Sequence, residues 1–294
     1  MGQRLHRPHE RMTLGKHDPF GNLDSWSPKF AESWATALRL RTAGVDQRRL
    51  RRRIVELAGL RPGDQMAEIG CGTGALLLDL AEAVGPGGRV TGYEPQHNLA
   101  AAAQEAVAAA GAGANIEVVR AGAADLELEP ASLHAVIEQT VFIHLPQFLI
   151  LDTLARALPA LRPGGRWVSA DQDGDTWIID HPDRELTRRI IAFNSDFRYA
   201  DGWTGRRLSR LLAEAGFIDV QVDVLTHVDT APGSYLHGMA LRIAESARTE
   251  GALSTAEYDR WVGRLSPSAG YERFYSSINY YVAVGRRAEI EPTP

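Results

Sequence analysis

EIGCGTG, residues 68–74, is the stretch that decides the fold of this chain of 294 residues. It follows a short apolar segment, residues 65–69, with the pattern of a buried strand, and it precedes ALLLDLA, residues 75–81, with the pattern of a helix. Its three glycines stand at alternate positions, so the backbone can turn tightly and approach a ligand with no Cβ in the way. This spacing predicts a ligand-binding turn between a strand and a helix.

Strands and helices are expected to alternate along the rest of the chain. The expected strands cover residues 65–70, 89–94, 116–120, 134–139, 166–171, 218–228 and 274–285. The expected helices between them cover residues 74–84, 97–110, 146–158, 182–197, 204–215, 234–250 and 255–265. Alternation of this kind predicts an α/β fold in which helices cover both faces of a parallel sheet.

Upstream of the glycine turn, residues 28–43 and 46–59 have the apolar spacing of two helices. Residues 1–20 are polar and lack periodicity, so we expect them to be disordered or loosely held. Several aromatic side chains gather between residues 20 and 34, namely Phe20, Trp26, Phe30 and Trp34.

Composition excludes several classes of function. A net charge of −5 and a pI near 6.0 argue against a broad nucleic-acid surface. Cys71 is the single cysteine, so the chain forms no internal disulfide and no cysteine cluster for zinc, and the histidines lack metal-ligand spacing. No apolar run approaches the ~20 residues of a membrane span, and the N-terminus lacks the apolar core of a signal peptide. We therefore expect a soluble, cytoplasmic protein without a metal, a membrane anchor or a nucleic-acid partner.

The glycine turn and the acid Glu68 before it resemble motif I of the class I, Rossmann-like S-adenosylmethionine-dependent methyltransferases. The resemblance covers roughly residues 60–287 and is strongest in the front half. There the chain is similar to menaquinone- and ubiquinone-type and small-molecule methyltransferases. It implies a seven-stranded, mostly parallel sheet with an antiparallel last strand. It also implies the division of the chain into an N-terminal helical cap at 21–60, a methyltransferase domain at 61–287 with helical lid elements around 174–215 and 234–270, and a tail at 288–294.

Glu94 ends the second expected strand about 20 residues beyond the glycine turn, where a carboxylate can accept both hydroxyls of a ribose. A solvent-facing glutamate at a strand end is the alternative. The third strand leads into AGAADL, residues 121–126, where related enzymes place an acid at the position of Gly122. Either Asp125 takes over that role or backbone groups of Ala123 and Ala124 hold the adenine. A helix cap is the equal alternative for Asp125, since an aspartate before a leucine in a loop is commonly one. The resemblance implies S-adenosyl-L-methionine as cofactor, bound by Glu68, Gly70, Cys71, Gly72, Gly74, Glu94, Pro95, Ala123, Ala124, Asp125 and Gln139.

His144 follows the fourth strand, in a segment that resembles the methyl-proximal edge of the cofactor site. Imidazole suits a general base, because its pKa lies near working pH, but a structural histidine is an equal alternative. Asp171 and Asp173 follow the fifth strand, at the edge that faces the acceptor in the family, and are further catalytic candidates.

Beyond these residues, the segment from Arg198 to Arg207 corresponds to the family's substrate lid. Arg206 and Arg207 could bind an acceptor carboxylate or could pair with Asp201. The aromatic side chains of the N-terminal segment either close the pocket or pack its helices onto the sheet.

The function we expect is methyl transfer to a small molecule, as in bacterial specialised metabolism, on oxygen, nitrogen or carbon. Two alternatives stay open: a non-methylating reaction with the same cofactor, such as cyclisation or decarboxylation, and a nucleic-acid methyltransferase or non-catalytic partner subunit. A homo-oligomer is also open.

Overall fold

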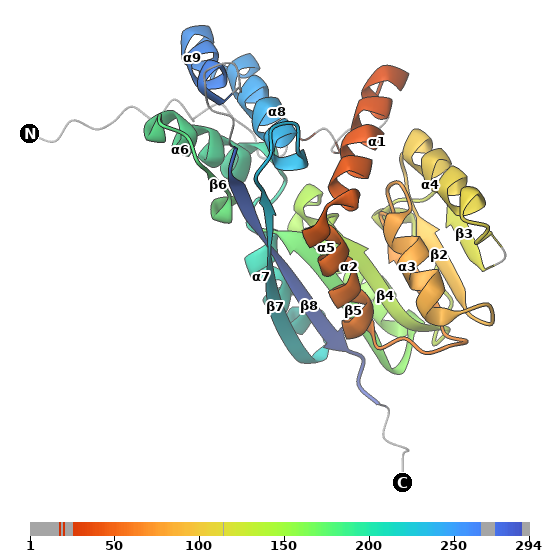
Figure 1. Ribbon diagram of the computed structural model, residues 1–294. Helices are drawn as coiled ribbons and strands as arrows, with labels where there is room; N and C mark the ends of the chain where they lie inside the picture. The colour runs from red at the N-terminus through yellow and green to blue at the C-terminus, as the bar shows by residue number, and fades with distance from the viewer. Residues whose placement is uncertain (1–17, 19, 21–25, 114, 266–273, 290–294) are drawn as a thin grey trace, which may run out of the picture.

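A computed structural model describes residues 18, 20, 26–113, 115–265 and 274–289 (Figure 1). Within these residues, one mixed sheet of eight strands has the order β3-β2-β1-β4-β5-β8-β6, with β7 also paired to β8. The strands are β1 Gln65–Ile69, β2 Arg89–Tyr93, β3 Ile116–Val119, β4 Leu133–Gln139, β5 Leu161–Gln172, β6 Ile178–Ile179, β7 Ile218–Asp229 and β8 Ser276–Arg286.

Strands β1 to β5 are parallel, and β8 is inserted antiparallel between β5 and β7. The predicted mixed sheet is therefore confirmed, although the eighth strand, β6, was missed because two residues carry no periodic signal. β5 also starts earlier than expected, at Leu161. Its register against β4 shifts after Leu133, so the glycine-containing turn at 162–165 forms an irregularity within the strand.

Nine α-helices surround the described part of the sheet: α1 Pro28–Ala43, α2 Val45–Ala58, α3 Ala75–Val84, α4 His97–Ala109, α5 Gln147–Ala160, α6 Arg184–Phe193, α7 Thr204–Glu214, α8 Tyr235–Thr249 and α9 Thr255–Leu265. Short helical turns are η2 Ala123–Asp125, η3 Phe142–His144 and η4 Gly174–Thr176. The helix expected at 182–197 changes at Asn194 into a π-helical turn, η5 Asn194–Arg198.

The strands bury alternate side chains on opposite faces of the sheet. Val136 on β4 packs in the cluster that contains α5 and α7, whereas its neighbours Ala135 and Ile137 pack in the cluster that contains α2, α3 and α8. This period of two follows from the pleat of a strand. Helices therefore cover both faces of the sheet, and the parallel strands β1 to β5 end together at one carboxyl edge.

Helix α1 stands over that carboxyl edge, between α4 and α8 (Figure 1). It begins at Pro28, and Ser27 caps it by accepting a hydrogen bond from the Phe30 N–H at 3.3 Å. Ala31, Ala35 and Leu38 are buried on its inner side. The helix thus forms one wall above the sheet rather than a free extension.

Three helices, α6, α8 and α9, lie together around one end of β8 (Figure 1). Trp261 of α9 is fully buried there, stacked on His181 at 4.8 Å between ring centroids. The two lid segments predicted from sequence correspond to η4 to α7 and to α8 and α9, with residues 266–273 outside the described part of the chain. Disorder was expected for residues 1–20, but Asp18 and Phe20 are described and both contact His144. The other residues of that segment, and residues 290–294 of the tail expected at 288–294, are outside the described part.

Candidate functional site

The glycine turn between β1 and α3 is fixed by the end of β2. The carbonyl oxygen of Tyr93 accepts hydrogen bonds from the N–H groups of Gly70 and Cys71, at 2.7 and 3.0 Å. Gly70 and Gly72 have positive φ values of 69° and 55°. A Cβ on Gly70 would lie 2.3 Å from Val141, whereas a Cβ on Gly72 would meet only Leu38, at 3.8 Å. The second glycine therefore leaves a space that a side chain would fill.

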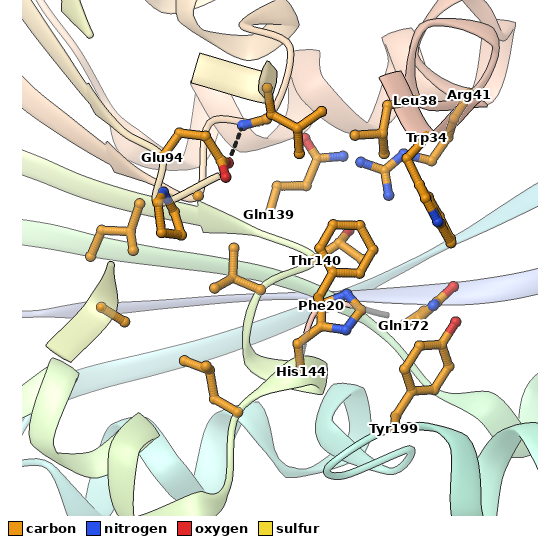
Figure 2. Close-up of a pocket in the computed structure, with 18 of the residues that line it drawn as sticks. Phe20, Trp34, Leu38, Arg41, Glu94, Gln139, Thr140, His144, Gln172 and Tyr199 are labelled. Atoms are coloured by element: carbon orange, nitrogen blue, oxygen red, sulfur yellow. Dashed lines mark hydrogen bonds between the residues drawn. The ribbon is translucent and has the colours of Figure 1, made fainter. Parts of the chain in front are cut away.

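That space belongs to a deep pocket between the carboxyl ends of the parallel strands and the helices α1 and α8 (Figure 2). Figure 2 shows Glu94 at one end of the pocket and Gln172 with Tyr199 at the other. Of the residues predicted from sequence, the pocket brings together Gly70, Gly72, Glu94, Pro95, Ala123, Gln139 and His144.

Glu94 is held in place by backbone groups. Its two carboxylate oxygens accept hydrogen bonds from the N–H groups of Gly72 and Gln96, both at 2.9 Å. Burial raises the pKa of this carboxyl to about 7, although these two hydrogen bonds oppose the rise. The side chain is oriented toward the pocket by its neighbours and is not a solvent-facing glutamate at a strand end, since it is only 5% exposed.

Glu68 lies on β1 beneath the glycine turn and is 3% exposed. One of its oxygens has no hydrogen-bond partner among the described residues, and burial together with Glu94 raises its pKa to about 8. It lines a smaller hollow that shares Leu38, Arg41 and Gln139 with the main pocket. A buried carboxyl with an unpaired oxygen is suited to receive a cationic group.

Several residues predicted to bind the cofactor lie away from the main pocket. Gly74 instead allows α3 to pack on α4, because a Cβ there would lie 3.2 Å from Ala103. Cys71 is a buried thiol whose pKa is raised by burial, and it contacts only the smaller hollow. Ala124 and Asp125 are exposed in η2, so of that turn only Ala123 lines the pocket.

Neither predicted catalytic aspartate lines the pocket. Asp171 is fully buried and accepts hydrogen bonds from the N–H groups of Ile143 and Gln172, both at 3.0 Å, so it holds the turn η3 against β5. Burial raises its pKa to about 7. Asp173 is also fully buried and forms a two-point ion pair with Arg206. Because strand residues alternate in direction, Gln172 between them faces the pocket.

The two arginines proposed for an acceptor carboxylate are occupied by protein groups. Arg206 pairs with Asp173 and, at 3.2 Å, with Asp175. Arg207 pairs with Asp201 at 2.5 Å, which was the structural alternative. Both guanidinium groups also lie over the ring of Trp203. These contacts stabilise the start of α7 and leave the acceptor to other residues.

His144 lies at the centre of the pocket with an aspartate that the sequence did not suggest. Its Nδ1 is 2.7 Å from Oδ2 of Asp18, which is 6% exposed. The Phe20 ring packs on the imidazole with 4.4 Å between ring centroids, and Tyr199 contacts it edge-on (Figure 2). A carboxylate accepts only, so Nδ1 donates and Nε2 is left as the proton acceptor. The residue therefore has the arrangement of a positioned base.

The pocket also contains cationic and strained residues, of which the sequence had indicated only Arg198, as part of the expected lid segment. Arg41, Arg198 and Arg242 line it from α1, η5 and α8. A signal for the first was present, because Trp34, Leu38 and Arg41 share one helix face by their spacing. Thr140 lines the pocket with a φ of 60°, a strained value for a residue with a branched Cβ. No sequence pattern indicates such a conformation.

The fold and the pocket define a Rossmann-like α/β protein whose pocket lies over the carboxyl ends of its parallel strands. A family model described as a methyltransferase domain matches residues 66–165. The solved structure of phosphoethanolamine N-methyltransferase 2 from Haemonchus contortus, in complex with S-adenosyl-L-methionine, aligns with a TM-score of 0.58 and 18% identity over 91% of this chain and 59% of that chain. The family match over residues 66–165 and the similar fold agree with the class I S-adenosylmethionine-dependent methyltransferase that the motifs predicted.

Two curated relatives are similar in sequence. An uncharacterized 37.1 kDa protein in transposon TN4556 of Streptomyces fradiae is 32% identical over 228 residues, which are 77% of this chain and 63% of the relative. The demethylmenaquinone methyltransferase of Staphylococcus aureus is 27% identical over 190 residues, 60% of this chain and 77% of the relative. The chain thus spans less than two thirds of the transposon protein and of the N-methyltransferase.

Proposed function

We propose that this protein transfers a methyl group from S-adenosylmethionine to a small molecule bound in the main pocket. The observation that carries the proposal is the pair of Gly72 and Glu94 at one end of that pocket, with Glu68 in the adjoining hollow and His144 at the pocket's centre. We also propose a cytoplasmic enzyme of small-molecule biosynthesis. Within the described residues, no helix combines the length and apolarity needed to span a membrane.

The residues at the Glu94 end fit the groups of this cofactor. Glu94 is placed to accept the two ribose hydroxyls, and the backbone at Gly72 leaves room for close approach. The unpaired oxygen of Glu68 suits the ammonium group of the methionine part. Arg41, which lines both hollows, suits its carboxylate. Ala121 and Ala123 line the part of the pocket that the adenine would occupy.

When bound, the cofactor supplies a methyl group on a sulfonium, which is an electrophile. The protein must hold the acceptor in line with it, and alignment of this kind is worth ~7–11 kcal/mol of a reaction barrier. His144 would accept the proton of an acceptor hydroxyl or amine at Nε2, while Asp18 holds the ring. Asp18 is then a positioning residue that acts through His144.

The aromatic wall of the N-terminal segment would keep water out of the reaction. Phe20 contacts Trp26 and Trp34 edge-on, with 5.1 and 5.0 Å between ring centroids, and it covers His144. Both alternatives raised for this segment therefore have support, because Trp34 lines the pocket while Ala31 and Ala35 pack the helix.

The test is incubation of the protein with S-adenosylmethionine and a panel of phenols, amines, carboxylates and phosphate esters, followed by mass spectrometry. We expect one or more acceptors to gain a methyl group as S-adenosylhomocysteine forms in equal amount. Consumption of the cofactor without any methylated product would favour a non-methylating reaction. Failure to bind either form of the cofactor would contradict the proposal.

A further inference from the structure

Three guanidinium groups, those of Arg41, Arg198 and Arg242, make the main pocket positive in a protein of net charge −5. Glu94 is the only acid among the described residues that line it. Formal charge in the pocket is therefore positive whether or not Glu94 is ionised. Such a concave positive surface raises the local concentration of anions.

These three arginines lack the carboxylate partners that other arginines of the protein have. Within the described chain no ion pair is formed by any of them, whereas Arg206 and Arg207 both pair with aspartates. Each also keeps a buried nitrogen that has no hydrogen-bond partner among the described residues: Nε in Arg41, Nε in Arg198 and Nη2 in Arg242. A buried guanidinium nitrogen that lacks a hydrogen-bond partner is costly, so these nitrogens are suited to an anion that arrives with a ligand.

Aromatic side chains and helix α8 bring the groups together. The guanidinium carbons of Arg41 and Arg242 lie 5.9 and 5.8 Å from the centre of the Tyr235 ring. Arg198 donates a hydrogen bond from Nη1 to Ser246 at 3.1 Å, and Ser246 lies one helical turn beyond Arg242 on α8. Two of the three cations, Arg198 and Arg242, are thus fixed along the same stretch of α8.

The cofactor alone does not account for all three. S-adenosylmethionine carries two positive groups and a single carboxylate, so it brings a net positive charge into a pocket that is already positive. Arg41 lines the hollow beside the glycine turn and suits that carboxylate, whereas Arg198 and Arg242 line only the main pocket. They remain for another anion.

Resting on the proposed function, we infer that the methyl acceptor is an anionic small molecule whose phosphate or carboxylate group is bound by Arg198 and Arg242. Arginine forks suit both oxyanions, because each can accept two parallel hydrogen bonds. The surrounding rings of Trp34, Tyr199 and Tyr235 suit an apolar or aromatic body on the same molecule.

Three probes with one ring and different charge test this inference: phenyl phosphate, benzoate and neutral benzamide. Each is titrated by calorimetry into the full chain saturated with S-adenosylhomocysteine. We expect at least one anion to bind about tenfold or more tightly than benzamide. Stronger binding of phenyl phosphate assigns a phosphate, and stronger binding of benzoate assigns a carboxylate. Equal affinity for all three probes, or no binding of either anion, would overturn the inference.

The variants Arg198→Gln and Arg242→Gln should each weaken the preferred anion about tenfold and change the affinity for S-adenosylhomocysteine less than threefold. Arg248→Gln is the matched control, since Arg248 lies on the same helix and pairs with Glu245. Arg242 is partly exposed, so its variant tests the site even where a change at buried Arg198 prevents folding. Unchanged anion affinity in Arg242→Gln contradicts the assignment. Loss of S-adenosylhomocysteine binding by the wild type would instead refute the proposed function.

Discussion

The two ends of the pocket are built in different ways. At the Glu94 end, the groups come from the first turns after β1, β2 and β3, and backbone hydrogen bonds fix them: Gly72 donates to Glu94, and Tyr93 accepts from Gly70. At the other end, the side chains come from α1, η3, η5 and α8, segments that the chain brings together from far apart. Backbone groups of neighbouring turns can bind one ligand in the same way while the side chains at the other end of the pocket change to bind a different ligand.

The largest effect on ligand binding should follow from a side chain that fills the space at Gly72. Gly72→Val places a branched side chain in the space that only Leu38 now borders, and it strains a backbone with positive φ. We expect binding of S-adenosylhomocysteine to be abolished in calorimetry while circular dichroism stays that of the wild type. Gly111→Val is the control for strain alone, because Gly111 also has positive φ but no atom near its Cβ position. Unchanged affinity in Gly72→Val would remove the turn from the site.

His144 tests the other end of the pocket. His144→Ala should lower kcat by about 10²–10⁴-fold with little change in cofactor affinity, because it removes the proton acceptor. His144→Gln keeps a hydrogen-bonding group but takes no proton, so it should lose nearly as much. Asp18→Asn should lose less, since it disturbs only the orientation of the ring. Full kcat in His144→Gln would reduce the residue to a positioning role, and activity that follows the acceptor's own pKa would mean that no base is needed.

Glu94 should contribute less to the affinity for S-adenosylhomocysteine than the glycine turn does. Two charge-assisted hydrogen bonds to the ribose contribute about 1.5–3 kcal/mol each before water compensates, so Glu94→Ala should weaken S-adenosylhomocysteine roughly tenfold or more. Glu94→Gln should lose less, because the amide oxygen still accepts. Wild-type affinity in both variants would show that Glu94 supports only the backbone of Gly72 and Gln96.

The same carboxyl predicts a pH dependence of binding. In the folded protein without ligand, burial raises the pKa of Glu94 to about 7, and its ionised form is the better acceptor for ribose hydroxyls. Ligand binding should therefore release a proton below that pH, so affinity should rise as pH increases toward about 7 and then level off. In Glu94→Gln this rise should be absent. A rise of equal size in that variant would assign the ionisation to another group, with Glu68 the first candidate.

The smallest effect on function is expected at Asp173, which pairs with Arg206 beneath the acceptor end. Asp173→Asn should lower the free energy of unfolding by about 1–3 kcal/mol, because it breaks the ion pair between a fully buried carboxylate and a partly exposed guanidinium, while kcat and ligand affinity stay near those of the wild type. Asp175→Asn, at the exposed partner of the same arginine, should cost less than about 1 kcal/mol. Chemical denaturation measures both. A large loss of kcat in Asp173→Asn without a loss of stability would return it to the catalytic candidates.

Sequence predicted the locally encoded end of the pocket better than the assembled end. Motif spacing placed Gly70, Gly72 and Glu94, because a single unit of consecutive strand, helix and strand, residues 65–94, positions all three. It misplaced Asp171 and Asp173, since the face that a strand residue takes depends on where the turn after the strand begins. Asp18 and Arg242 carried no signal, because their roles arise only when distant segments meet over the sheet.

The most direct test of the account is a calorimetric titration of S-adenosylhomocysteine into the wild-type protein, with NAD titrated in parallel. Both ligands carry the ribose diol that Glu94 is placed to accept, but only the first carries the ammonium and carboxylate groups that suit Glu68 and Arg41. We expect one binding site per chain for S-adenosylhomocysteine and no measurable heat for NAD. Saturable binding of NAD, or no binding of S-adenosylhomocysteine, would contradict it.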